Sequence, residues 1–148
     1  MIDDELIEER RRRRIDRLRE HIASENEQDF ERTIATFSHP RYELVPTGEV
    51  YDGTDEVMAY YVRGRSVITD QRNEEIAIHV AGDALILEFW LRGTHLGGPT
   101  ATGRAFEARM CAVFDFDEDD MITCERVYFD QQTISNQLRG VAPTGSPR

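Results

Sequence analysis

The chain has 148 residues, of which 39% are hydrophobic and 32% charged, and its net charge is −11. This length and balance fit one globular domain and argue against a disordered chain. The acidic charge argues against nucleic acid as a partner, because phosphate contacts need a basic face. No apolar run approaches the length of a membrane span, and the charged start of the chain is unlike a secretory leader, so we expect no membrane contact and a cytoplasmic location.

The N-terminal segment is helical in composition. Glutamates three or four positions before the run Arg10–Arg14 favour intrahelical ion pairs, which predicts a charged helix over residues 3–24. Nucleic acid or an anionic membrane could bind the arginine run. The net charge favours a solvated helix face or contact with the acidic surface of the protein itself.

A second helix is predicted over residues 24–37. Ser24 and Glu27 have the spacing of a capping box, and the proline after His39 stops the helix. We expect His21 and His39 to be surface residues.

Short strands and a third helix follow, and then the hydrophobic period changes to two. The sequence predicts strands over 42–45 and 50–51, a helix capped by Thr54, strands over 74–81, 85–91, 106–116 and 121–129, and a closing helix over 131–138 that Gly140 ends. Helices come first and hairpin-linked strands later, which is typical of an α+β domain. A long bent antiparallel meander with helices on its concave side leaves room for a pocket.

The sequence offers no metal site. Asp115, Asp117 and Asp119 imitate the start of a calcium loop, but Asp120 stands where that loop needs glycine, so a solvated hairpin turn is favoured. Cys111 and Cys124 fall in strand-like segments and are interpreted as buried free thiols. We expect neither a metal nor a cofactor.

Several motifs occur in an order that resembles a known family. They are Tyr51-Asp52-Gly53, Tyr60-Tyr61, Gly93 to Gly97, Thr102-Gly103-Arg104, and Glu125 to Asp130 with Gln137-Leu138. Over about residues 30–140 the chain resembles the SnoaL-like polyketide cyclases of the nuclear-transport-factor-2-like superfamily. The resemblance implies a cone-shaped, curved antiparallel sheet wrapped around the N-terminal helices. It also implies a pocket domain over 25–140 and a homodimer formed through the sheet face. From the residues themselves we expect the charged N-terminal helix over 1–24 to pack on or extend this domain and the tail over 141–148 to be disordered.

The same resemblance implies a catalytic aspartate at the end of the last strand, which is Asp130. Its carboxylate would act as acid and base in an apolar pocket, and His95 or Tyr128 would stabilise the oxyanion. Each residue has an alternative role. Asp130 could simply cap the closing helix, and His95 could be a hydrogen-bonded structural histidine.

Further residues are candidates for substrate binding. Tyr51, Trp90, Phe106 and Met110 would line a pocket for a flat hydrophobic ligand, although each is also an ordinary core residue. Asp70 and His79 are polar candidates, and Asp70 could instead form a turn. Two more ionisable residues, Glu88 and Arg109, lie inside strands. They could pair across the sheet or line a ligand cavity.

The sequence therefore predicts a cofactor-independent cyclase, isomerase or lyase acting on a small hydrophobic carbonyl compound. The helper histidine of the cyclases has no counterpart near Asp115–Asp117. Two alternatives stay open: a non-catalytic module that binds a hydrophobic small molecule, and a dimeric interaction protein of the same fold.

Overall fold

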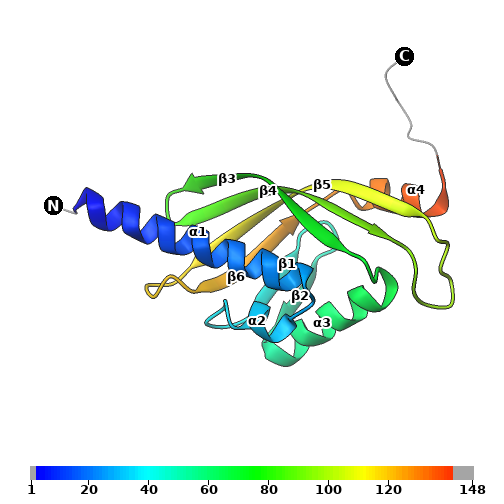
Figure 1. Cartoon of the computed structure of the whole chain (residues 1–148), viewed down its shortest axis with the longest axis horizontal. Helices are drawn as coiled ribbons and strands as arrows, with labels where there is room; N and C mark the ends of the chain where they lie inside the picture. The colour runs from blue at the N-terminus through cyan, green and yellow to red at the C-terminus, as the bar shows by residue number, and fades with distance from the viewer. Residues whose placement is uncertain (1–2, 142–148) are drawn as a thin grey trace, which may run out of the picture.

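The computed structural model describes residues 3–141, so most of the tail expected to be disordered lies outside the described residues. Three helices gather on one face of a curved six-stranded sheet, and a fourth helix lies at one end of it (Figure 1). In chain order the elements are α1 (Asp4–Asn26), α2 (Phe30–Ile34), β1 (Arg41–Leu44), β2 (Glu49–Asp52), α3 (Thr54–Val67), β3 (Arg72–Ala81), β4 (Ala84–Thr94), β5 (Ala105–Phe116), β6 (Ile122–Tyr128) and α4 (Gln131–Arg139). The α+β prediction is confirmed.

The strand order across the sheet is β2-β1-β6-β5-β4-β3. All neighbours pair antiparallel except β1 and β6, which run parallel with Tyr42 opposite Glu125. Strands β3 to β6 form the predicted antiparallel meander. A parallel bridge between Phe37 and Ile122 starts the alignment, so the chain enters β1 already running in the direction of β6.

The alternation predicted for β4 and β5 is confirmed, and one phase of it makes the core, whereas Ile76 and Val80 of β3 remain exposed. Leu85, Leu87 and Phe89 of β4 face the same side as the alternate residues of β5, and all are buried. The buried residues of β5 are Phe106, Ala108, Met110, Ala112 and Phe114. α1 lies over this face of the sheet (Figure 1), and its Leu18 is fully buried in the core.

The predicted helix boundary at Ser24 is wrong, because α1 continues to Asn26. Ser24 is fully buried, where its hydroxyl donates to the carbonyl of His21 and lies 2.8 Å from Oγ1 of Thr33. Packing between two helices has therefore overridden the local capping preference. Asp29 caps the short α2 instead, and Gly53 rather than Thr54 stands at the N-cap of α3.

The arginine run contacts the acidic surface of the protein itself, as the net charge favoured. Arg14 and Asp120 form a buried pair at 2.8 Å, and Arg13 reaches the other carboxylate oxygen at 2.8 Å. Arg14 also donates to the carbonyls of Asp83 and Asp117, so it joins α1 to both hairpin turns at this end of the sheet. The acidic turn between β5 and β6 therefore holds α1 against this end of the sheet.

The other face of the sheet carries polar pairs. Glu88 and Arg109 approach to 3.7 Å across it, which confirms the cross-sheet salt bridge. Cys124 is buried as predicted, whereas Cys111 is only half-buried because it lies on this face.

No helix within residues 3–141 is long and apolar enough to cross a membrane.

Candidate functional site: a buried histidine–carboxylate pair

A small cavity lies between the sheet and the helices. Its volume is about 60 Å³, enough for roughly four to six water molecules. Half of its lining residues are apolar, and the polar half, which we call the polar end, includes ionisable residues from α1, β1, α3 and β6. The apolar wall consists of Ile22, Leu87, Phe89, Leu91, Met110, Phe114 and Val127, and the polar side consists of His21, Glu25, Tyr42, Tyr60, Gln71, Asn73 and Glu125.

His21 and Glu125 are the centre of the polar end. Nε2 of His21 lies 2.9 Å from Oε1 of Glu125, although the two residues are 104 positions apart in the sequence. The imidazole is 1% exposed and lies between the rings of Phe37 and Phe114, both in edge-to-face contact. An ionisable pair held in such apolar surroundings is costly unless its members share a proton or a charge.

Two tyrosines extend this pair into a hydrogen-bonded chain. The hydroxyl of Tyr42 lies 3.1 Å from Nε2 of His21 and 2.5 Å from the hydroxyl of Tyr61. Burial raises the pKa of both phenols well above the ordinary value, so both stay neutral and can donate a hydrogen bond. The chain therefore runs from α3 through β1 to α1 and β6.

A second carboxylate approaches the same nitrogen. Oε2 of Glu25 lies 3.6 Å from Nε2 of His21, one helical turn further along α1. Arg65 of α3 pairs with the other oxygen of Glu25 at 3.0 Å and is only 7% exposed. The two carboxylates, the imidazole and the guanidinium make the polar end close to neutral when His21 is protonated.

Charge and burial act on this pair in opposite directions. Burial lowers the pKa of His21, but the hydrogen bond to Glu125 and the charges of Glu125 and Glu25 outweigh burial, so the pKa is raised. Burial raises the pKa of the Glu125 carboxyl, and the charge of Glu25 adds to this effect while His21 opposes it. Both groups therefore hold protons more tightly than in water, and pKa values shifted by burial and charge are typical of acid and base groups at functional sites.

Only one of the predicted site residues, Met110, lines this cavity. Asp130 is exposed and caps α4, where its carboxylate accepts from the backbone N–H of Thr133 at 3.1 Å and from its hydroxyl at 2.7 Å. These hydrogen bonds lower the pKa of Asp130. The capping alternative is thus observed, and a catalytic role for Asp130 stays a prediction.

The two proposed oxyanion partners also lie away from the cavity. His95 follows β4 and is half-buried, with Nδ1 lying 3.3 Å from the hydroxyl of Thr102. Tyr128 is 43% exposed and lies opposite Cys111 on the outer face of the sheet. The structure therefore does not bring His95, Tyr128 and Asp130 together around one enclosed space.

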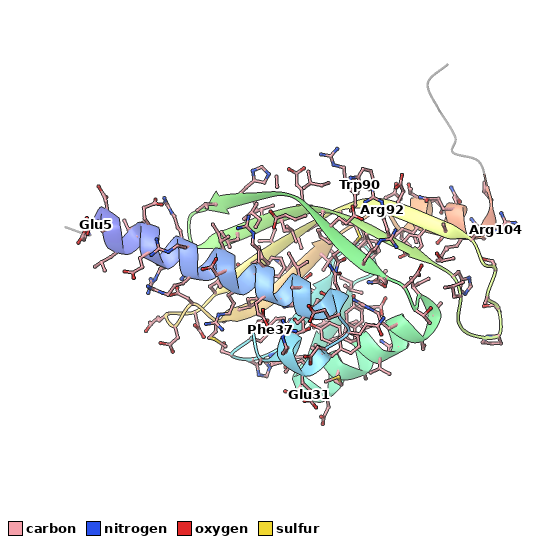
Figure 2. The ribbon with its side chains drawn as sticks, in the orientation of Figure 1. Glu5, Glu31, Phe37, Trp90, Arg92 and Arg104 are labelled. Atoms are coloured by element: carbon pink, nitrogen blue, oxygen red, sulfur yellow. The ribbon has the colours of Figure 1, made fainter. Side chains whose placement is uncertain are left out.

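The remaining candidates divide between the outer face and the sheet ends. Trp90 lies on the outer face with the guanidinium of Arg92 over its ring (Figure 2). His79 is exposed on the same face and lies 2.7 Å from Glu88. Phe106 is buried beside an open crevice near Gly93, outside the cavity.

Two candidates take structural contacts instead. Asp70 is exposed and lies in the turn between α3 and β3, as the turn alternative predicted, and its carboxylate also accepts hydrogen bonds from the backbone and hydroxyl of Thr94 at the end of β4. Tyr51 stacks on Tyr60, a lining residue of the cavity, with ring centroids 4.6 Å apart.

The prediction that His21 is a surface residue is wrong, and this error hid the site. His21 has charged neighbours in the sequence, but it is in phase with Arg14, Leu18 and Glu25, all buried on one face of α1. Glu125 is in phase with Val127 on the core side of β6. The available sequence signal was that a histidine and a glutamate each lie on the buried face of their element. It could be interpreted as a site only once the structure showed that these two faces of α1 and β6 meet.

No cluster of histidine, cysteine, aspartate and glutamate within residues 3–141 has the arrangement needed to hold a metal ion. The residues at the polar end are instead paired with one another.

Comparison with known proteins gives the same fold. The chain is similar to a phenazine biosynthesis-related protein from Pseudomonas aeruginosa, with 20% identity, coverage of 99% of this chain and 94% of that one, and a TM-score of 0.78. It is similar to a putative polyketide cyclase from Xanthomonas campestris, with 19% identity, coverage of 87% and 98%, and a TM-score of 0.76. It is also similar to a hypothetical protein from Catenulispora acidiphila with a ketosteroid isomerase-like fold, solved in complex with trimethylamine, with 17% identity, coverage of 88% and 97%, and a TM-score of 0.72.

The structure thus has a ketosteroid isomerase-like fold. The profile of the SnoaL-like domain matches residues 18–125, which is more than half of the chain, and the chain belongs to this family. No curated protein sequence matches it significantly. The matched segment begins at Leu18 and ends at Glu125, so it contains both members of the buried pair.

Proposed function

We propose that this protein is an acid/base enzyme that moves a proton on a small hydrophobic carbonyl compound, with Glu125 and His21 as the acting groups. The observation that carries the proposal is their 2.9 Å contact at the polar end of an otherwise apolar cavity. Fold relatives described as polyketide cyclases support a reaction of the cyclase, isomerase or lyase type.

The step that we propose is removal of a proton from the carbon next to the carbonyl. The carboxylate of Glu125, made more basic by burial, takes this proton, and the electron pair moves to the carbonyl oxygen. A neutral Tyr42 hydroxyl donates a hydrogen bond to that oxygen and stabilises the enolate. His21 holds Glu125 in place and neutralises its charge between turnovers. The step uses side chains alone.

The size of the cavity bears on the substrate. A volume of about 60 Å³ accepts only a small part of a drug-sized molecule, so the reacting carbonyl would enter while the rest of the substrate lies toward Gln71 and Asn73. Those two side chains can hydrogen-bond a polar group at that side. A larger ligand requires the end of α1 to move away from β3.

The experiment begins with a thermal-shift screen of polyketide, steroid, terpenoid and fatty-acyl compounds. Carbonyl compounds that bind are then incubated with the protein in D₂O, and exchange of the hydrogen next to the carbonyl is followed by mass spectrometry. We expect Glu125→Gln to slow exchange by about 10²–10⁴-fold, the usual contribution of a general base. Asp130→Asn replaces the other candidate for the general base, and this variant should catalyse the hydrogen exchange at the wild-type rate. The reverse pattern would assign the reaction to Asp130.

A binding module is the second candidate, because the polar groups of the cavity already satisfy one another. It predicts ligand binding without exchange in any variant. We also expect a homodimer through the outer sheet face, where Tyr128 and Trp90 leave apolar surface uncovered. Light scattering at micromolar concentration that gave only a monomer would contradict the dimer.

A further inference from the structure

The two ring nitrogens of His21 face chemically different partners. Nδ1 lies 3.0 Å from Oγ1 of Thr36, and Nε2 lies 2.9 Å from Oε1 of Glu125. The imidazole is 1% exposed, so each nitrogen depends on the partner that the protein supplies. The protonation of the ring can therefore be deduced from what those partners are able to donate or accept.

The single hydrogen of the Thr36 hydroxyl is already in use. Oγ1 of Thr36 lies 2.6 Å from the carbonyl oxygen of Thr33, which has no hydrogen to give, so the hydroxyl must donate to that carbonyl. Thr36 is 2% exposed. Toward His21 its oxygen can then only accept a hydrogen bond, and Nδ1 must carry a hydrogen.

A fixed hydrogen on Nδ1 determines the state of the other nitrogen. A neutral ring of this tautomer has a lone pair on Nε2, directed at Glu125, and a lone pair cannot lie 2.9 Å from an ionised carboxylate oxygen without repulsion. One proton must therefore lie between them. The pair is either imidazolium with carboxylate or imidazole with carboxylic acid, and these two states differ only by the position of that proton.

We propose that Thr36 is a positioning residue that keeps Nδ1 of His21 protonated, so that the ring exchanges protons only through Nε2 and Glu125. Its catalytic value rests on the proposed function, whereas the tautomer follows from the Thr33–Thr36–His21 contacts alone. The other groups that face His21 are Glu25 from its own helix and Tyr42 from β1, with Tyr61 and Arg65 of α3 behind them. Among the described residues, none of these four groups forms a hydrogen bond with Nδ1 of His21.

Replacing the hydroxyl removes the reason for this tautomer. In Thr36→Val, Nδ1–H would face a methyl group, so the neutral ring should move its hydrogen to Nε2, where the ionised Glu125 can accept it. The imidazolium then also loses one acceptor, and its pKa should fall. Thr36→Ser keeps the hydroxyl and should behave as the wild type.

The measurement is a two-bond ¹H–¹⁵N NMR spectrum of the histidine side chains from pH 5 to 9. The His21 signals are assigned as those absent from His21→Gln, since the chain has four histidines. We expect an N–H type shift at Nδ1 over the whole range in the wild type and in Thr36→Ser. In Thr36→Val we expect a switch to the Nε2–H tautomer, with a tenfold or greater loss of any carbonyl exchange activity and recovery of that activity in Thr36→Ser.

An unprotonated Nδ1 in the wild-type spectrum would overturn the proposal without any variant, even if Thr36→Val fails to fold. A folded Thr36→Val that keeps its hydrogen on Nδ1 would overturn the positioning role. If the tautomer is as expected but Glu125→Gln retains full exchange activity, the proposed function fails and the tautomer assignment remains.

Discussion

The side-chain amide of Asn26 and the backbone of Asn73 form two hydrogen bonds, both 2.8 Å long, that join the end of α1 to the edge strand β3. β3 is the last strand on its side of the sheet, so its outward backbone groups would otherwise face solvent. Asn73 also lines the cavity. This junction therefore borders the cavity.

We expect Asn26→Ala to weaken the junction and to open this side of the cavity more often. Loss of two partly exposed hydrogen bonds should cost about 1–2 kcal/mol of unfolding free energy. Hydrogen exchange at the amide of Asn73 should become faster while exchange at the centre of β5 stays slow. Asn26→Asp, which keeps the acceptor but loses the donor, should be intermediate, and an unchanged Asn73 amide in Asn26→Ala would contradict the role of this junction.

Asp120 should dominate the attachment of α1. Asp120 is 3% exposed and receives Arg13 and Arg14 at 2.8 Å, so Asp120→Ala leaves the buried guanidinium of Arg14 with the backbone carbonyls of Asp83 and Asp117 but without its buried carboxylate. Breaking a buried pair in this way costs about 3–5 kcal/mol. Urea unfolding measures the loss, and Asp119→Ala in the same turn is the matched control.

The acid dependence of stability follows from the same pair. Burial raises the pKa of Asp120, but the hydrogen bonds from Arg13 and Arg14 outweigh burial, and the pKa is lowered. The stabilising contribution is therefore present above the unfolded value near pH 4 and is lost as the pH falls through the lowered pKa. In the acid range, the urea midpoint should change less steeply with pH in Asp120→Asn than in the wild type. Asparagine is the chosen replacement because it tolerates the positive φ of 60° at this position.

The His21–Glu125 pair should give a pH dependence of the opposite sign. The pKa values of both groups are raised, so the folded protein binds these protons more tightly than the unfolded chain does. For His21 the contribution is complete below about pH 6.5 and is lost as the pH rises through its raised pKa. Urea midpoints from pH 6 to 9 should fall more steeply in the wild type than in His21→Gln. Equal slopes would indicate that His21 is not charged in the folded protein.

Two glycines in the same region should respond to alanine in opposite ways. A Cβ on Gly97 would collide with the carbonyl group of Ser66, whose carbon lies 2.9 Å away, so Gly97→Ala should cost about 1–3 kcal/mol. Gly64 is inside α3 with nothing within 4 Å of such a Cβ, so Gly64→Ala should add about 0.5–1 kcal/mol. Thermal unfolding of both variants tests this. A loss of stability in Gly64→Ala would contradict the open space beside α3.

The sequence predicted the elements that depend on local pattern. The alternation from Phe106 to Phe116 predicted β5, because one face of that strand is buried along its whole length. Gly140, in the left-handed conformation with φ of 73°, ends α4 as predicted. The boundary at Ser24 was wrong because contacts with Thr33, which lie outside any local window, keep Ser24 inside the helix.

The candidate site could not be predicted in the same way, since it depends on one helix crossing one strand. The charged neighbours of His21 masked its place on the buried face of α1. Glu125 belongs to the motif that suggested the family, yet the resemblance directed attention to Asp130 five residues later. Only the packing of α1 against β6 identifies Glu125 as the partner of His21.

The parallel pairing of β1 with β6 sets Tyr42 directly beside Glu125, although the chain makes one strand early and the other last. Loop closure over such a separation is entropically unfavourable until most of the sheet exists. A chain that lacks β6 lacks Glu125 and the strand beside Tyr42, so the whole sheet must be in place before the polar end of the cavity exists.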